Sequence, residues 1–326
     1  LGGLLARLRA VDPGVVVVNG RGLMVLVRAA TRGNGPGPTL TLTADGDGIS
    51  IACGSYTFTV DGIPADKYPP TLALDGEPVS LDGQALRRAI ERTAFTAVTD
   101  DSRPVLACVL FENRDGAVRL AAADGFRLAV TTLPAGAADV GAFKVPVLVH
   151  RCAALALADV IGKYPGPVAF RVDKWSIQAS VNGSTLVARR GEGTFPNYEQ
   201  IIPRQCRTTI LADAAELRAA LAPLSKGMPQ GSPLLTVTTA PDGNGLTLSA
   251  ISGENGGRSS ATVNAAVEGA PVTAALNARY LADELAVSGP TVEWRIMTPD
   301  SPFVFAGPDR MGVIKPMHIF DRKSPE

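Results

Sequence analysis

Starting at Leu81 the chain reads LDGQALRRAI, and starting at Leu211 it reads LADAAELRAAL. Each stretch places an Asp, Asp82 or Asp213, ahead of apolar residues at helical spacing, which is the pattern of a capped helix N-terminus. Their starting points, residues 81 and 211, lie 130 residues apart. A match at this distance indicates a repeated domain rather than a short solenoid repeat.

Two further pairs of segments repeat at a similar distance. The strand-like residues 54–60 lead to Tyr68-Pro69, as residues 183–188 lead to Phe195-Pro196, and the two prolines are 127 residues apart. Leu-Ala-Asp occurs at 157–159 and again at 281–283, which is 124 residues later. Together the three pairs predict three related domains: a partial domain 1 (1–79), domain 2 (80–207) and domain 3 (208–326) with a short C-terminal tail.

The segments between the helices alternate apolar and polar residues and end in turn dipeptides. Asp124-Gly125, Asn182-Gly183 and Asp242-Gly243 each separate two such segments. This pattern is typical of antiparallel hairpins. We therefore predict an α+β fold in which each domain packs two helices against two small antiparallel sheets.

The first domain departs from this plan. Leu4 to Ala10 resembles the helical stretch from Leu155 to Ile161, so we expect the first half of the domain to be absent. Residues 15–38 then read as an insertion relative to domain 2, ending in a Gly- and Pro-rich loop over 33–38.

Composition argues against catalysis and against a bound cofactor. The 326 residues include two histidines and four cysteines with no Cys-x-x-Cys pair, which disfavours a metal site and His-dependent nucleophilic catalysis. There is no GxxxxGK[ST] phosphate-binding loop. No apolar run approaches the roughly 20 residues of a membrane helix, and no secretory signal is visible. We expect a non-catalytic cytoplasmic protein that requires no cofactor.

Five segments, in this order along the chain, resemble the β subunit of bacterial DNA polymerase III, the sliding clamp family. They are residues 101–112 (DSRPVLACVLFE), 123–130 (ADGFRLAV), 193–203 (GTFPNYEQIIP), 276–283 (LNARYLAD) and 313–319 (VIKPMHI). The resemblance implies a ring-forming head-to-tail homodimer that encircles duplex DNA without sequence specificity as a processivity factor. It also implies partners, namely replicative and repair polymerases and the clamp loader, that dock through short peptides containing Leu and Phe.

Contacts to DNA phosphates are expected from basic residues on or near the helices. Since Lys and Arg together equal Asp and Glu at 31 each, any basic face must be local. The candidates are Arg87, Arg88, Arg92, Arg103, His150, Arg151, Arg218 and Lys226. The competing interpretation is that each is an ordinary solvated residue of an amphipathic helix.

The resemblance also implies a peptide-binding pocket between domains 2 and 3. Its residues would be Leu106, Gly125, Phe126, Arg127, Leu128, Pro196, Gln200, Ile201, Asn277, Tyr280, Val313, Ile314, Pro316 and Met317. Apolar side chains would hold the peptide, while Arg127, Asn277 and Tyr280 would satisfy its backbone polar groups. The competing interpretation is that Leu128, Ile201 and Ile314 are core residues beneath a seam between domains. Phe126, Gln200, Lys315 and His318 depart from the family pattern, which predicts an altered partner preference.

A second function stays open at this point. A clamp-like protein that binds clamp partners or inhibitors, as a decoy or resistance copy, would not need to encircle DNA, and the short first domain and neutral charge favour it. Such a protein would be a monomer that is not retained on circular DNA. A third possibility, an enzyme with an unrecognised site, finds no convergent polar residues in the sequence.

Overall fold

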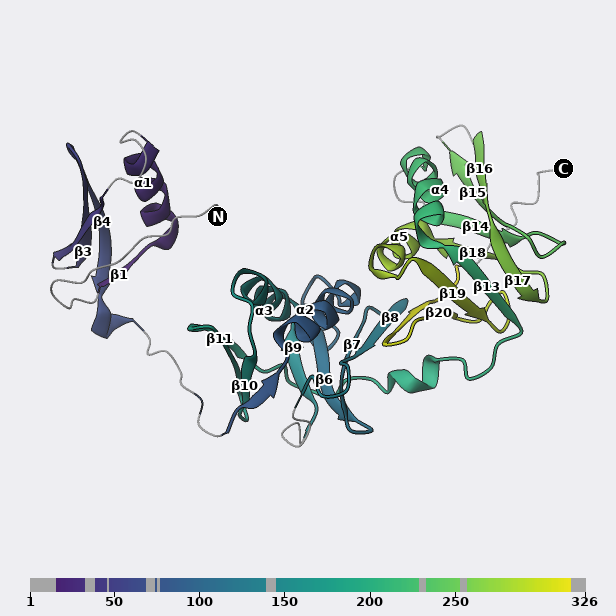
Figure 1. The fold of residues 1–326 in the computed structure, drawn as a ribbon, viewed down its shortest axis with the longest axis horizontal. Coiled ribbons are helices and arrows are strands. Elements are labelled where there is room, and N and C mark those ends of the chain that lie inside the picture. Colours follow the sequence, from purple (N-terminus) through teal and green to yellow (C-terminus); the bar gives the residue numbers. More distant parts are fainter. Residues whose placement is uncertain are drawn as a thin grey trace. The chain divides into compact units, whose positions relative to one another are not determined.

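The computed structural model describes residues 16–32, 39–45, 47–68, 74, 77–138, 145–228, 233–252 and 257–317. The chain divides into two compact units, Leu1–Leu72 and Ala73–Glu326 (Figure 1). Each is described by itself below. Among the described residues, no helix has both the length and the apolar character needed to cross a bilayer, and no three His, Cys, Asp or Glu side chains come together as a metal site.

The described residues of the first unit form one antiparallel sheet and one helix. Its strands are arranged in the order β1-β4-β3-β2. The helix α1 packs on β3 and β4, and Asn19 Oδ1 accepts the N–H groups of Arg21 and Gly22 at its start. The elements are β1 (Val16–Val18), α1 (Gly20–Arg32), β2 (Thr41–Asp45), β3 (Gly48–Cys53), β4 (Tyr56–Pro64) and the 3-10 turn η1 (Ala65–Lys67).

Residues 15–38 were predicted to be an insertion, and the structure corrects this. Helix α1 occupies 20–32, and the order β1-α1-β2-β3-β4-η1 is also the order of the second half of the next repeat, β9-α3-β10-β11-β12-η4. Helix α1 is therefore the counterpart of α3. Gly20 and Gly22 read as turn signals in the sequence, but they lie in the first helical turn, where Asn19 caps the free N–H groups. The predicted helix from Leu4 to Ala10 and the loop over 33–38 lie outside the described residues.

The second unit contains two modules with the same order of elements. The middle module runs from β5 to η4 and the last module from β13 to β21. The middle module consists of β5 (Val79–Leu81), α2 (Gly83–Glu91), η2 (Ala94–Thr96), β6 (Cys108–Arg114), β7 (Ala117–Ala123), β8 (Arg127–Thr132), β9 (Val147–His150), α3 (Arg151–Lys163), β10 (Val168–Val172), β11 (Ser176–Val181), β12 (Ser184–Arg189) and η4 (Tyr198–Ile201).

The last module repeats this plan with one additional strand, β17. It consists of β13 (Thr208–Asp213), α4 (Ala214–Gly227), β14 (Leu234–Thr239), β15 (Leu246–Ser252), β16 (Gly257–Val263), β17 (Ala265–Gly269), β18 (Thr273–Asn277), α5 (Ala278–Val287), β19 (Thr291–Ile296), β20 (Phe303–Ala306) and β21 (Arg310–Ile314). The predicted α+β class is confirmed. The C-terminal tail beyond residue 317 lies outside the described residues.

The local signals that revealed the repeat have the predicted structural basis. Asp82 accepts the N–H of Ala85 at 2.7 Å at the start of α2, and Asp213 accepts the N–H of Glu216 at 2.8 Å at the start of α4. Asn182 and Gly183 both have positive φ, at 43° and 79°, and join β11 to β12. Two positive φ values are the geometry of a two-residue hairpin turn, which Asn-Gly adopts readily.

The two modules also share their sheet topology. The order β12-β11-β10-β5 in the middle module corresponds to β21-β20-β19-β13 in the last, and β8-β7-β6-β9 corresponds to β16-β15-β14-β18. The modules join where β21 pairs antiparallel with β8, with Val313 opposite Leu128 and Ile314 opposite Arg127. This pairing makes one continuous nine-stranded sheet.

Each module has its own hydrophobic core, and a third cluster lies at the joint. In the middle module α2 packs against α3 (Figure 1), above the stacked rings of Phe111 and Phe170. In the last module α4 packs against α5, and Trp294 is fully buried in the core. Leu128, Val130 and Val313 belong to the cluster at the joint. Burial of a leucine such as Leu128 contributes about 1.5–3 kcal/mol.

Candidate functional site

The joint between β8 and β21 holds the buried members of the predicted pocket. Leu128, Val313 and Ile314 are each at most 3% exposed and lie on paired strands. For Leu128 and Ile314 the structure therefore supports the competing interpretation that they are core residues of the seam. The pairing of β8 with β21 fixes the backbone positions of the residues that flank these strands.

The turn before β8 presents an aromatic side chain to solvent. Asp124 Oδ1 accepts the N–H groups of Phe126 and Arg127 at 2.9 and 3.0 Å, and Gly125 has φ 95°, which disfavours a side chain at that position. Lys315 N–H donates to the carbonyl of Phe126 at 2.8 Å. Phe126 is 55% exposed although its backbone is held on both sides. An aromatic ring that is exposed to solvent on a hydrogen-bonded backbone is well placed to contact a partner.

A second group of predicted residues lies on the segment that connects the modules. Ile201 is 51% exposed, and Pro196 and Gln200 are exposed as well. Tyr198 anchors this segment because its hydroxyl donates to Glu112 on β6 at 2.6 Å. Burial and the Glu112 carboxylate raise the pKa of Tyr198 to about 12. Tyr198 is buried, whereas Ile201 is exposed. Ile201 is therefore not a core residue, and for it the competing interpretation is wrong.

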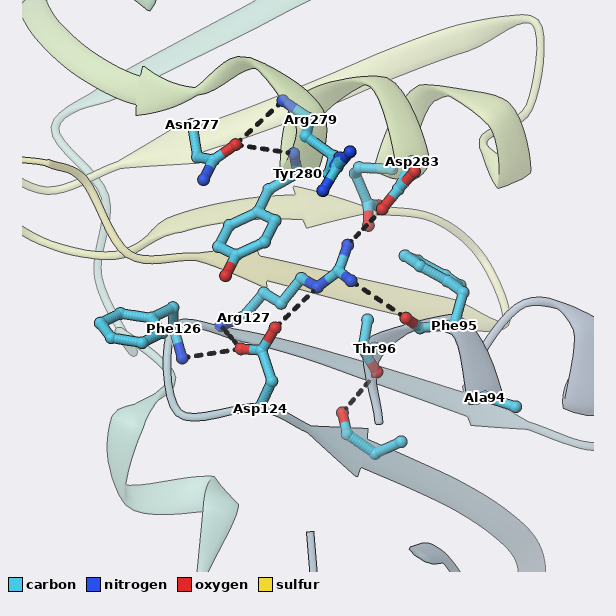
Figure 2. A network of polar contacts seen from close by, with 12 residues as sticks. Ala94, Phe95, Thr96, Asp124, Phe126, Arg127, Asn277, Arg279, Tyr280 and Asp283 are labelled. Atoms are coloured by element: carbon cyan, nitrogen blue, oxygen red, sulfur yellow. Dashed lines mark hydrogen bonds and ion pairs between the residues drawn. The ribbon is translucent and has the colours of Figure 1, made fainter. Parts of the chain in front are cut away.

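Arg127 lies at the centre of a polar network that joins the two modules (Figure 2). Its Nε donates to Asp124 at 3.0 Å, one terminal nitrogen donates to Asp283 on α5 at 2.6 Å, and the other donates to the carbonyl of Phe95 at 3.1 Å. The guanidinium carbon also lies 4.4 Å from the ring centre of Tyr280 and 5.4 Å from that of Phe95. With its side chain only 12% exposed, Arg127 has a protein partner for every guanidinium nitrogen.

Tyr280 and Asn277 belong to the start of α5. Asn277 Oδ1 accepts the N–H groups of Arg279 and Tyr280, at 2.9 and 3.4 Å, and so caps the helix (Figure 2). Burial raises the pKa of the Tyr280 hydroxyl, the Asp124 carboxylate adds to the rise, and Arg127 opposes it. The neutral hydroxyl is therefore retained at physiological pH. The Tyr280 ring and the Asn277 amide thus belong to the start of the helix that also carries Asp283.

Three predicted residues remain, Leu106, Pro316 and Met317. Met317 N–H donates to the carbonyl of Ala275 at 2.7 Å, and Leu106, Pro316 and Met317 are half-buried. Two cavities lie nearby, of about 470 and about 620 Å³. Pro196 lines the smaller one, and none of the other thirteen predicted residues lines either. Neither cavity therefore gathers the predicted residues as its lining.

The predicted DNA-facing residues have different surroundings. Arg88 and Lys226 are exposed on α2 and α4, whereas four other candidates on or next to helices have partners. Arg87 pairs with Glu91 at 2.8 Å, Arg92 with Asp309 at 2.8 Å, Arg151 donates to the carbonyl of Ala94 and Arg218 to that of Leu285.

The two candidates outside the helices are placed differently. Arg103 is exposed on a loop beside Gly125, so it lies near the Phe126 turn. His150 ends β9 and accepts the N–H of Cys152 at the start of α3.

Several residues of the site were not predicted. Asp124 could have been identified from its three-residue spacing to Arg127. Asp283 gave no such signal, since it lies 156 positions from Arg127 along the chain. Phe95 gave no signal because it contributes a backbone carbonyl and one ring face. Helix α1, with three arginines and no acidic residue, was missed as a basic helix because residues 15–38 were read as an insertion.

Comparison with known proteins confirms the resemblance predicted from the sequence. The sequence profile of the DNA polymerase III beta subunit, central domain, matches residues 80–197. The beta sliding clamp of Synechococcus elongatus is 28% identical over 259 residues, covering 78% of this chain and 69% of that protein. The beta sliding clamp of Pseudomonas aeruginosa is 28% identical over 212 residues, covering 65% of this chain and 56% of its own length.

Solved structures extend the likeness of fold to nearly the whole chain. The DNA polymerase III subunit beta from Pseudomonas aeruginosa superposes with a TM-score of 0.85 at 24% identity, covering 95% of this chain and 84% of that one. A sliding clamp from Bartonella birtlesii, solved bound to griselimycin, gives a TM-score of 0.82 at 20% identity, covering 90% and 80%.

Proposed function

From the premise that residues 80–197 belong to the central-domain family of the DNA polymerase III β subunit, we propose that this chain is a sliding clamp subunit. In this role it encircles duplex DNA as a processivity factor and docks polymerases and other partners at the seam between its modules. It works by tethering and not by catalysis. We keep the division into domains at 1–79, 80–207 and 208–326 as part of the proposal.

The observation that carries the proposal is the edge-to-edge joint between like modules. The final strand of the last module, β21, pairs with β8 of the middle module. The counterpart of β8 in the last module is β16, which in the described part of the chain pairs only with β15. A contact that repeats head to tail between like units closes into a ring when the rotation per unit is right.

The same geometry suggests how two copies join. Strand β4 is the counterpart of β12 and β21, and over Tyr56–Asp61 its pairing among the described residues is with β3 alone. An unpaired strand edge is a template for another chain. We therefore propose that β16 of one copy pairs with β4 of a second copy, giving a head-to-tail homodimer.

Charge on the helices supports contact with DNA. The five helices carry ten Arg or Lys and five Asp or Glu, although the chain as a whole is balanced at 31 and 31. Two of the five acidic residues, Asp283 and Glu284, are paired with arginines outside the helices, Arg127 and Arg310. Helices with an excess of cations fit sequence-independent, salt-sensitive contact with phosphates.

The exposed apolar residues at the seam support partner docking. Phe126 and Ile201 are held by anchored backbone, with Tyr280 and Met317 on the other module. We propose that this surface takes short peptides carrying Leu and Phe from polymerases and from the clamp loader. Arg127, with all its nitrogens engaged, acts here as a fixed element of the surface rather than as a free donor to the peptide.

Two measurements test the proposal. Sedimentation velocity of the full chain should show a dimer. After incubation with the clamp loader and nicked circular DNA, the protein should co-elute with the DNA in high salt and be released when the circle is linearised, because topological linkage resists salt whereas phosphate contacts do not. A monomer that is not retained on circles would instead support the rival decoy function.

A further inference from the structure

We propose that Asp283 is a positioning residue of the docking surface: it holds Arg127, and through Arg127 it fixes the ring of Tyr280 for the incoming peptide. This inference rests on the proposed function and names a residue that acts on the docking surface without touching the peptide. Residues of both modules contact one guanidinium group, that of Arg127 (Figure 2).

Of the three hydrogen bonds that the Arg127 guanidinium donates in Figure 2, one joins the two modules, and its acceptor is Asp283. Arg127 and its partners Asp124 and Phe95 belong to the middle module, whereas Asp283 is on α5 of the last module, 156 positions along the chain. At 2.6 Å this contact is also the shortest of the three. A charge-assisted hydrogen bond of this length fixes both orientation and distance.

Tyr280 lies one helical turn before Asp283 on the same helix. Its ring centre is 4.4 Å from the guanidinium carbon of Arg127, within the range of a cation–π contact. The carboxylate and the ring therefore hold the same guanidinium from one helix. If the carboxylate is lost, Arg127 keeps Asp124 and Phe95, but its hydrogen bond to α5 is gone. The Tyr280 ring then packs on a guanidinium that is no longer tied by a hydrogen bond to its own helix.

The neighbouring Glu284 does not share this role. Glu284 points into the last module, where its carboxylate pairs with Arg310 and both side chains are buried. Asp283 is 40% exposed and faces the seam. Adjacent acidic residues of α5 thus bind different arginines, one inside the module and one at the docking surface.

The seam also offers a matched control. Asp309 in the last module pairs with Arg92 of the middle module at 2.8 Å and is 43% exposed, close to the 40% of Asp283. Asp309→Asn therefore removes an ion pair between the same two modules at similar exposure. Its partner Arg92 lines the cavity of about 620 Å³, which contains none of the predicted docking residues.

The experiment measures the dissociation constant of a fluorescein-labelled synthetic peptide bearing Leu and Phe, by anisotropy, on the full-length chain. We expect Asp283→Asn to weaken binding by about threefold to tenfold, as loss of an oriented cation–π contact implies. Asp283→Glu should recover most of the affinity, and Asp309→Asn should bind as the parent chain does. Melting temperatures of Asp283→Asn and Asp309→Asn should fall by similar small amounts.

The possible failures are distinguishable. If the parent chain binds the peptide and Asp283→Asn binds equally well, or if Asp309→Asn weakens binding as much, the positioning role is wrong while the docking function stands. If the parent chain binds no such peptide, the proposed docking surface is itself wrong and this inference falls with it.

Discussion

Arg310 on β21 donates hydrogen bonds through both terminal nitrogens to the carboxylate of Glu284 on α5, and Nη2 lies 2.8 Å from Oε2. Both side chains are at most 4% exposed. Arg310 Nε also donates to the carbonyl of Arg92 at 3.0 Å, so the buried pair reaches the middle module. Gly312 leaves room for the Glu284 carboxylate, since a Cβ at position 312 would collide with it.

Removing one partner of this pair should destabilise the last module strongly. We expect Glu284→Ala to lower the free energy of unfolding by about 3–5 kcal/mol, because it leaves the Arg310 charge buried without its counter-ion. Urea denaturation followed by the fluorescence of the buried Trp294 measures this loss. The control is Glu91→Ala, which breaks the exposed pair with Arg87 and should cost less than about 1 kcal/mol. Equal losses in the two variants would contradict the prediction.

The sequence predicted the elements whose signals are local. The Asp82 and Asp213 caps and the Asn182-Gly183 turn depend on residues within a few positions of one another, so their spacing is visible in the sequence. The repeat could be recognised for the same reason, since each module must form the same helices and hairpins. The resemblance to the sliding clamp family rested on five other short segments, from residues 101–112 to residues 313–319, and is confirmed.

The errors arose where local signals and tertiary structure disagree. Gly20 and Gly22 indicate a turn in isolation, but Asn19 caps them into α1, which packs on β3 and β4. The ion pair between Arg127 and Asp283 depends on how two modules meet, and no spacing along the chain encodes it. Burial of Leu128 and Ile314 against exposure of Phe126 likewise follows from the pairing of β8 with β21.

Phe126 should contribute to peptide binding and little to stability. Its ring is 55% exposed, so Phe126→Ala removes few intramolecular contacts. We expect the dissociation constant for a Leu- and Phe-containing peptide to rise about tenfold or more, as for an aromatic residue at the centre of an interface, with the melting temperature unchanged. Trp175→Ala is a matched control because Trp175 is 57% exposed on the turn before β11. A comparable loss of affinity in this control would count against a specific site.

Arg88 and Lys226 should contribute to DNA binding through charge alone. Both are exposed on helices, so each substitution by Ala should weaken binding to unrelated duplexes equally. In a plot of log affinity against log salt, each should lower the slope by about one. Lys174→Ala serves as the control, since Lys174 lies over the Trp175 ring on a turn between sheet strands. If Lys174→Ala lowered the slope as much as the helix variants, α2 and α4 would not be the DNA-facing elements.

Tyr198 should make stability depend on alkaline pH. Its pKa is raised to about 12 by burial and by the hydrogen bond to Glu112, above its ordinary value near 10. Because the folded state holds the proton more tightly than the unfolded state, this contribution is complete below pH 10 and is lost as pH rises through 12. At pH 8 we expect Tyr198→Phe to be less stable by about 1–2 kcal/mol, for loss of a hydrogen bond to a carboxylate.

The difference between the parent chain and Tyr198→Phe should then shrink between pH 10 and 12, because Phe does not titrate. Free energies of unfolding from urea titrations at pH 8, 10, 11 and 12 measure this convergence, and other ionising groups cancel in the difference. Tyr164→Phe is the control for loss of a tyrosine hydroxyl at pH 8, since Tyr164 is half-exposed at the end of α3 and should cost less than Tyr198→Phe. The prediction is contradicted if the difference in free energy of unfolding between the parent chain and Tyr198→Phe stays constant up to pH 12. In that case the pKa of Tyr198 is not raised by its contact with Glu112, and packing alone anchors the connecting segment.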